Sequence, residues 1–213
     1  MIIKKFLHSC ILLENEGKRL LIDPGAFSFI EKKVLSADIG NVDAILVTHK
    51  HIDHYFPEAL KALLSKQSVP VIANEEVCTL LEREGIQGSM IKEEESIKIA
   101  SFRIKALKAP HEPIPGECPH NLAFSINETV LHPGDSFRTG DQCEVLLLPI
   151  AGPWCRLVDA INFAQRISPK KVVPIHDAVI KEFMLERMYQ VCESKLGPAI
   201  TFHPLRLGEQ LRV

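Results

Sequence analysis

The sequence is organised around one polar stretch, Thr48-His49-Lys50-His51-Ile52-Asp53-His54, which places three imidazoles and one carboxylate within seven residues. It follows the run 43–47, whose apolar character is typical of a buried strand, and it precedes Phe56-Pro57, where a helix is expected to begin. The stretch is therefore predicted to form a loop at the end of a strand, where a rigid scaffold meets solvent.

The spacing within this loop suits two neighbouring metal ions. Residues two apart in an extended loop point the same way, so His49 and His51 can bind one ion, while Asp53 and His54 can reach a second. Imidazole nitrogens suit zinc, iron or manganese, and a carboxylate adds negative charge. The alternative is a polar surface loop, but only nine histidines occur in the whole chain, so this concentration favours a metal site.

Length and composition predict an ordinary globular chain. The 213 residues suffice for one domain with a hydrophobic core, expected to span 1–213, and 46% of them are hydrophobic. The net charge of -2 argues against binding to nucleic acid, which usually requires a concentrated basic surface. No apolar run approaches the length of a membrane span, so no membrane partner is expected.

The N-terminus does not resemble a secretory signal. His8 interrupts its apolar run, and Glu14-Asn15-Glu16 follows where small residues would be needed. The six cysteines are scattered without a Cys-x-x-Cys pair, which is typical of reduced thiols. We therefore expect a cytoplasmic protein.

Strand-like and helix-like runs alternate along the chain. Strands are expected at 2–7, 10–14, 19–22, 43–47, 69–73, 90–91, 96–100, 102–107, 121–126, 129–131, 145–150 and 171–175, with one or two more near the C-terminus. Helices are expected at 56–64, 74–85 and 157–164, and between Ile180 and Gly197. Composition and periodicity alone predict an α/β or α+β fold.

Three further polar segments follow predicted strands. His111 opens a loop rich in proline that also contains His120, Asp135 lies beside a glycine in a turn, and His176 follows the strand 171–175. A carboxylate, Asp23, also ends the strand 19–22.

The pattern His-x-His-x-Asp-His at 49–54 resembles the signature of the metallo-β-lactamase-fold hydrolases. Leu-Ile-Asp-Pro at 21–24, Gly-Asp-Ser at 134–136 and a histidine ending a strand at 176 are similar to further family segments, in the family's order. The resemblance covers nearly the whole chain. It implies a four-layer αββα sandwich, in which two mixed sheets pack face to face, helices lie outside, and the metals bind at one edge.

The resemblance also implies a dinuclear metal site with assigned ligands. The first ion would be bound by His49, His51 and His111, the second by Asp53, His54 and His176, with Asp135 bridging both. Asp53 and Asp135 would be the catalytic carboxylates. His120 remains an alternative to His111, because both lie in the same loop.

Four other polar residues lie outside this predicted ligand set. Asp23 is either a brace for the metal loop or an ordinary turn aspartate, and His8 lies in a segment similar to a Gly-His-Ser segment of one family branch, where it could line the site. His132 is expected to support the metal ligands or to be structural rather than to bind metal itself, and His203 is expected to be structural.

The resemblance implies a metal-dependent hydrolase that uses a metal-bound hydroxide. The expected cofactors are two divalent metal ions, with zinc as first choice and manganese or iron as alternatives. The segments Gly-Pro-Trp at 152–154 and Pro-Ile-His at 174–176 resemble a branch that includes sugar-phosphate lactonases, which favours a small polar ester or lactone as substrate.

Several alternatives stay open. They are a phosphodiesterase of the same fold, a catalytically degenerate metal-binding protein, and a di-iron redox relative, although such relatives normally carry a flavin domain. The expected partner is a small-molecule substrate, and a homo-oligomer also remains open.

Overall fold

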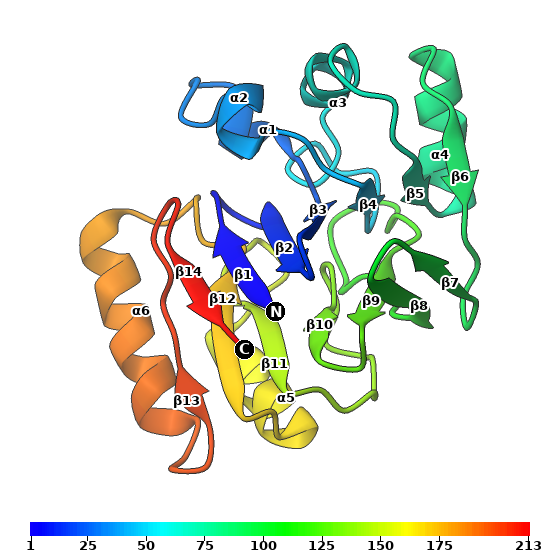
Figure 1. Cartoon of the computed structure of the whole chain (residues 1–213). Coiled ribbons are helices and arrows are strands. Elements are labelled where there is room, and N and C mark those ends of the chain that lie inside the picture. Colours follow the sequence, from blue (N-terminus) through cyan, green and yellow to red (C-terminus); the bar gives the residue numbers. More distant parts are fainter.

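Two seven-stranded β-sheets pack face to face and helices cover their outer faces, as seen in a computed structural model that describes residues 1–213 (Figure 1). In spatial order the first sheet contains β14 (Gln210–Arg212), β1 (Ile2–Lys5), β2 (Ile11–Asn15), β3 (Lys18–Ile22), β4 (Ala44–Val47), β5 (Val71–Ala73) and β6 (Gly88–Met90). The second contains β13 (Thr201–Phe202), β12 (Lys171–Ile175), β11 (Val145–Pro149), β10 (Val130–His132), β9 (Leu122–Ile126), β8 (Phe102–Lys108) and β7 (Ser96–Ile99). The helices are α1 (Ala26–Phe29), α2 (Ser36–Ile39), α3 (Pro57–Leu64), α4 (Glu75–Arg83), α5 (Leu157–Ile167) and α6 (Glu182–Lys195).

Both sheets are mixed and have the same pattern of pairing. In the first sheet the strands from β14 to β3 pair antiparallel, and those from β3 to β6 pair parallel. In the second sheet the strands from β7 to β10 pair antiparallel, and those from β10 to β13 pair parallel. Parallel strands end at the same edge of their sheet, so the loops after β3, β4, β10 and β12 can meet there.

Strand sequences reflect their place in the layers. All four residues of β4 and all five of β11 are buried, because these central strands are covered on both faces. The edge strand β7 instead alternates exposed and half-buried residues.

Three hydrophobic clusters correspond to the three interfaces between four layers. The cluster between the sheets includes Leu13 and Leu46 from one sheet and Phe124 and Leu147 from the other. A second cluster joins α5 and α6 to the outer face of the second sheet, and a third packs α3 and α4 on the first. The predicted αββα sandwich is therefore confirmed.

The main difference from the sequence-based expectation lies between β3 and β4. Two helices of four residues each, α1 and α2, occur there, whereas no element was predicted. A single helical turn contains too few residues to show a 3.6-residue apolar period, so periodicity cannot reveal it. None of the six helices combines the length and hydropathy that crossing a bilayer requires.

Gly25 allows the segment after β3 to lie against the histidine-rich loop after β4. The backbone N–H of Ala26 donates to the carbonyl of Ile52 over 2.8 Å, and a Cβ atom at Gly25 would lie 1.7 Å from the Asp53 carbonyl oxygen. Only glycine permits this approach, and the contact holds the backbone of Asp53 against the segment after β3.

Gly25→Ala is therefore expected to lower the free energy of unfolding by about 2 kcal/mol or more, since backbone must move to admit the methyl group. Urea unfolding followed by circular dichroism measures this change. Gly140→Ala is the matched control, because a Cβ there meets nothing within 4 Å. Equal stability of the two variants would contradict the close approach.

Candidate metal centre

Eight side chains with metal-binding atoms converge where the parallel strands end. They come from the β1–β2 turn (His8), the loop after β4 (His49, His51, Asp53 and His54), and the segments after β8 (His111), β10 (Asp135) and β12 (His176). Their donor atoms form two groups, each with all atoms within 4.8 Å of one another: His49, His51, His111 and Asp135, and His8, Asp53, His54 and His176. All seven residues predicted as ligands are brought together, and His8 joins them.

Asp135 lies between the two groups. Its Oδ2 is 3.4 Å from His111 Nε2 in the first group and 3.2 Å from His176 Nε2 in the second. Its Oδ1 is 3.1 Å from His54 Nε2. The carboxylate thus faces donors of both groups.

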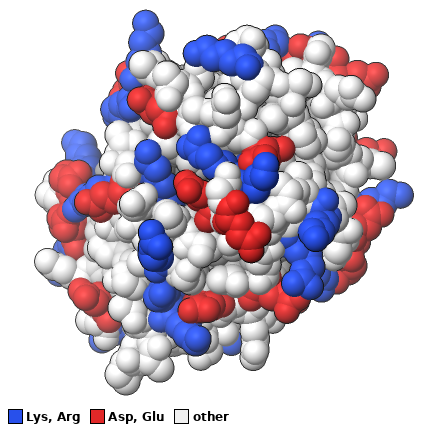
Figure 2. Space-filling view, in the orientation of Figure 1, with Lys and Arg blue, Asp and Glu red and all other residues white.

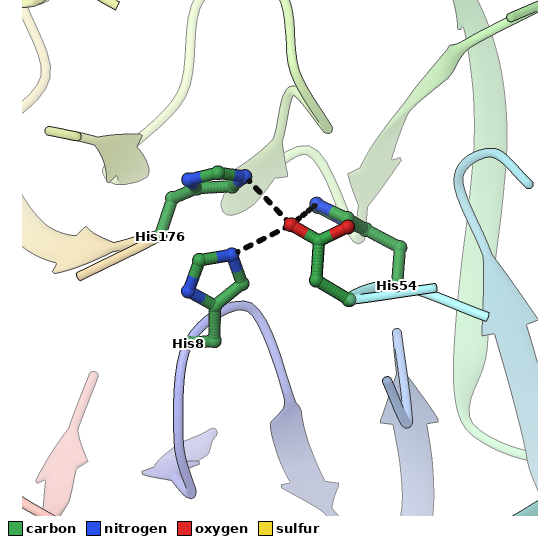
Figure 3. A group of neighbouring side chains, drawn as sticks. His8, His54 and His176 are labelled. Atoms are coloured by element: carbon green, nitrogen blue, oxygen red, sulfur yellow. Dashed lines mark hydrogen bonds and ion pairs between the residues drawn. The ribbon is translucent and has the colours of Figure 1, made fainter. Parts of the chain in front are cut away.

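Asp53 is the centre of the second group. Its Oδ2 lies 3.0 Å from His8 Nε2, 3.3 Å from His176 Nε2 and 3.9 Å from His54 Nε2. Figure 3 shows the three imidazoles arranged around this one carboxylate oxygen, each from a different part of the chain. Asp53 is the more accessible carboxylate, with 17% of its side chain exposed against 1% for Asp135.

Asp23 contacts the histidine-rich loop and holds it in place through Thr48 and His54. Its carboxylate accepts hydrogen bonds from the backbone N–H and the hydroxyl of Thr48, both at 2.8 Å, and lies 2.7 Å from His54 Nδ1. A carboxylate that contacts the second ring nitrogen fixes the orientation of a histidine, so His54 Nε2 is held toward Asp135. Of the two roles left open by the sequence, the structure places Asp23 in that of a brace.

Three residues of the centre have a left-handed backbone. The φ angles are 60° at His8, 49° at Asp23 and 60° at His176. This conformation is unfavourable for residues with a Cβ, and such strain concentrates at functional sites. His8 lies within the β1–β2 turn and His176 directly after β12, and both imidazoles face Asp53.

The carboxylates and imidazoles shift each other's pKa values. Burial opposes ionisation of Asp135, but the charges of His176 and His54 outweigh it and hold the pKa of this carboxyl well below its usual range. Burial likewise opposes protonation of His176, but Asp135 and Asp53 outweigh it and raise its pKa to about 9. The buried negative charges therefore require positive charge nearby, which imidazolium supplies when no cation is bound.

In His8 and His49, burial outweighs the nearby carboxylates, so the pKa of each imidazole is lowered. Burial, followed by the charge of His176, lowers the pKa of His8 to about 4, and burial and His54 hold the pKa of His49 well below its usual range. Both rings are neutral near pH 7, the form in which imidazole binds metals.

Unpartnered buried atoms show that the residues fit metal ions. His54 Nε2, His111 Nε2, His176 Nε2 and Asp135 Oδ1 are buried and make no hydrogen bond of good geometry, although they lie within ion-pair distance of the neighbouring carboxylates or imidazoles. Leaving buried polar atoms unpaired costs about 1–3 kcal/mol each, so four in one cluster call for a ligand. Divalent cations would satisfy all four at once.

Trp154 forms an apolar wall beside both groups. Its ring centroid lies 5.8 Å from that of His111 and 5.3 Å from that of His176. Gly152 makes room for it, because a Cβ at that position would lie 3.1 Å from the indole nitrogen. The indole shields the imidazoles from water on this side.

The remaining histidines lie outside the two groups. His120 is exposed and its Nε2 lies 3.5 Å from Glu93 Oε1, so within the loop after β8 it is His111 that reaches the centre. His132 is buried outside both donor groups. Its Nε2 contacts the Ser9 carbonyl at 3.2 Å, and its Nδ1 accepts a hydrogen bond from the N–H of Gly134. His203 is half-buried and belongs to neither group.

His8 is more central than sequence reasoning expected. The backbone N–H of Ala178 donates to His8 Nδ1 over 3.3 Å, which leaves Nε2 facing Asp53. The Leu-His-Ser segment was the available signal, but a lone histidine in a turn does not reveal which strand end it will face.

Comparison with known proteins agrees with this geometry. A family model described as the beta-lactamase superfamily domain matches residues 2–176. Protein Rv0786c of Mycobacterium tuberculosis is 30% identical over 184 residues, which cover 82% of this chain and 83% of that protein. A UPF0173 metal-dependent hydrolase of Carboxydothermus hydrogenoformans is 27% identical, with 79% and 81% covered.

A solved structure has the same architecture. Igni18, described as a novel metallo hydrolase from Ignicoccus hospitalis, superimposes with a TM-score of 0.77 at 22% identity, covering 99% of this chain and 98% of that one. The shared fold, together with the family match over most of the sequence, shows that this chain belongs to the β-lactamase superfamily and has the metallo-β-lactamase fold.

Proposed function

We propose that this chain is a metal-dependent hydrolase with a dinuclear centre, acting on a small ester or lactone. The observation that carries the proposal is the position of Asp135, whose two oxygens face histidines of both donor groups. The name metal-dependent hydrolase, given to the relative from Carboxydothermus hydrogenoformans, agrees with it.

The two donor groups would each bind one metal ion. His49, His51 and His111 would hold one ion, Asp53, His54 and His176 the other, and Asp135 would touch both. Zinc is the first choice for this donor set, with manganese and iron as alternatives. Two such ions would supply Lewis acidity, lowering the pKa of a water from about 15.7 toward 7 and polarising the substrate's oxygen.

The protein itself contributes orientation and exclusion of water. Asp23 holds His54 in one orientation through a contact of 2.7 Å, and Ala178 holds His8, which in turn contacts Asp53. Asp53 is the carboxylate with an exposed edge, so it is placed to accept a proton from an attacking water or pass one to the leaving group. The Trp154 wall lowers the local dielectric, which strengthens these interactions.

The surface charge supports a small substrate. Figure 2 shows Lys and Arg interspersed with Asp and Glu over the face drawn, with no broad area of one sign. A polyanionic polymer would be expected to require such an area.

Asp135→Ala is expected to reduce bound metal from about two equivalents per chain to one or fewer, and to abolish nearly all turnover, because it removes a ligand from both positions. Metal analysis after zinc reconstitution measures the first effect. Asp141→Ala is the control, since Asp141 is a partly exposed carboxylate whose contact is Lys105. Unchanged turnover per bound metal in Asp135→Ala would exclude the bridging role.

Substitution of the two histidines in the loop after β8 separates their roles. His111→Ala should weaken zinc binding at the first position by at least about tenfold, since three histidine ligands become two. His120→Ala should leave zinc affinity unchanged, because its imidazole lies at Glu93. Isothermal titration with zinc measures both, and the reverse pattern would transfer the ligand role to His120.

Turnover by the zinc-loaded protein of representative esters, lactones, thioesters and phosphodiesters tests the reaction class. Ester or lactone hydrolysis should be lost with a chelator and restored by zinc or manganese, because the ions supply the water activation. Phosphodiester turnover alone would replace the proposed substrate, and metal-independent turnover would contradict the mechanism.

A further inference from the structure

A pocket lies beside the metal centre, and the proposed reaction has so far given it no role. It is a pocket of about 850 Å³, within the size range of small-molecule sites. Its walls come from the β1–β2 turn, the region of α1, the N-terminal part of α6 with the segment before it, and the segment before β14 (Figure 1). These segments are far apart in sequence, so the fold itself creates the pocket.

The pocket adjoins the second donor group. Phe27 lines it, and the Phe27 ring meets the His8 ring edge-on with centroids 4.8 Å apart. His8 in turn contacts Asp53 at 3.0 Å. The residues directly after His176, from Asp177 to Ile180, form another wall. Phe27 and His8 thus lie between Asp53 and the pocket, and a molecule whose reactive group lies at Asp53 would reach the pocket by running past Phe27.

The lining is mostly apolar. Eleven of its 17 residues are hydrophobic, among them Leu7, Phe27, Ile30, Val179, Ile180 and Leu207. Ile30, Val179 and Leu207 are 59%, 53% and 45% exposed, so apolar surface that could be buried remains open to water. Covering such surface is favourable, in proportion to its area.

Every charged side chain of the lining already has an opposite partner within the lining. Lys5 pairs with Asp177, Lys33 with Glu31 at 2.6 Å, and Arg206 with Glu182 at 2.8 Å. The Tyr189 hydroxyl also donates to Asp177, over 2.6 Å. No charge is free to bind an anionic or cationic group, and an ion would have to compete with an existing pair.

We propose that this pocket binds the apolar acyl part of the substrate, so that the enzyme selects esters or lactones with a neutral hydrocarbon chain. The inference rests on the proposed function for its reaction and on the pocket for its selectivity. It changes the expectation of a small polar substrate: the scissile group is polar, and the acyl group attached to it is apolar.

The test compares p-nitrophenyl acetate, butyrate and hexanoate as substrates of the zinc-loaded protein. The kcat/KM is expected to rise about threefold per added methylene, as each is removed from water. Val179→Asp should reduce kcat/KM for hexanoate about tenfold and leave that for acetate within about twofold, because only the longer chain reaches the pocket. Val158→Asp is the matched control, since Val158 is also 53% exposed but lies on α5, outside the lining.

A second readout does not depend on turnover. The neutral fluorophore N-phenyl-1-naphthylamine should bind the zinc-loaded protein, and Val179→Asp should weaken this binding about tenfold while Val158→Asp does not. If no ester is hydrolysed but this pattern of fluorophore binding holds, the pocket assignment stands and the proposed reaction fails.

Two results would overturn the pocket assignment. One is a kcat/KM that does not depend on chain length, together with fluorophore binding that Val179→Asp leaves unchanged. The other is a dimer in sedimentation experiments that Val179→Asp dissociates, since a second copy of the chain would then cover the pocket.

Discussion

The burial of two carboxylates among histidines is the constraint on which the rest of the centre depends. Asp135 is almost fully buried and Asp53 largely so, yet nearby imidazoles keep the pKa values of both low enough for ionisation. Buried charge is costly unless it is paired, so the site needs cations. The nitrogens of His54, His111 and His176 that lack hydrogen bonds surround these same carboxylates. A cation bound there would therefore satisfy the nitrogens and neutralise the carboxylates together.

The fold provides the place where these groups meet. Each sheet changes from antiparallel to parallel pairing once, at β3 in the first sheet and at β10 in the second. Asp23 follows β3 and Asp135 follows β10, so a carboxylate stands at each of these changes in direction. Hydrogen bonds donated by Thr48 to the Asp23 carboxylate then join the ends of neighbouring strands, and Gly25 lets the two loops lie in contact. The rigidity of the centre thus follows from strand pairing as much as from its own contacts.

Much of this arrangement could be predicted from the sequence, because its signals are local. The strands are apolar runs of five residues or so, and the cluster from His49 to His54 is dense enough to be recognised in isolation. Asp135 and His176 each follow a predicted strand, and their assignment as metal ligands came from the family resemblance. The sheet pairing itself came from the family resemblance, since periodicity cannot say which strands are neighbours.

The features that were not predicted depend on contacts between distant segments. His8 reaches Asp53, 45 positions away, only because the β1–β2 turn folds over the loop after β4. His111 was predicted as the ligand, with His120 as the alternative in the same loop, and only the path of that loop shows that His111 faces Asp135 while His120 lies at Glu93. The one-turn helix α1 carries no periodic signal, although its Phe27 contacts His8 on one side and lines the apolar pocket on the other.

The most direct test of the dinuclear centre is a crystal structure of the zinc-loaded protein with anomalous scattering measured at the zinc edge. Two peaks on either side of the Asp135 carboxylate are predicted, one within bonding distance of about 2.0–2.2 Å from His49, His51 and His111, the other from Asp53, His54 and His176. A single peak that leaves one of these groups without zinc, or peaks at His120 instead, would contradict the account.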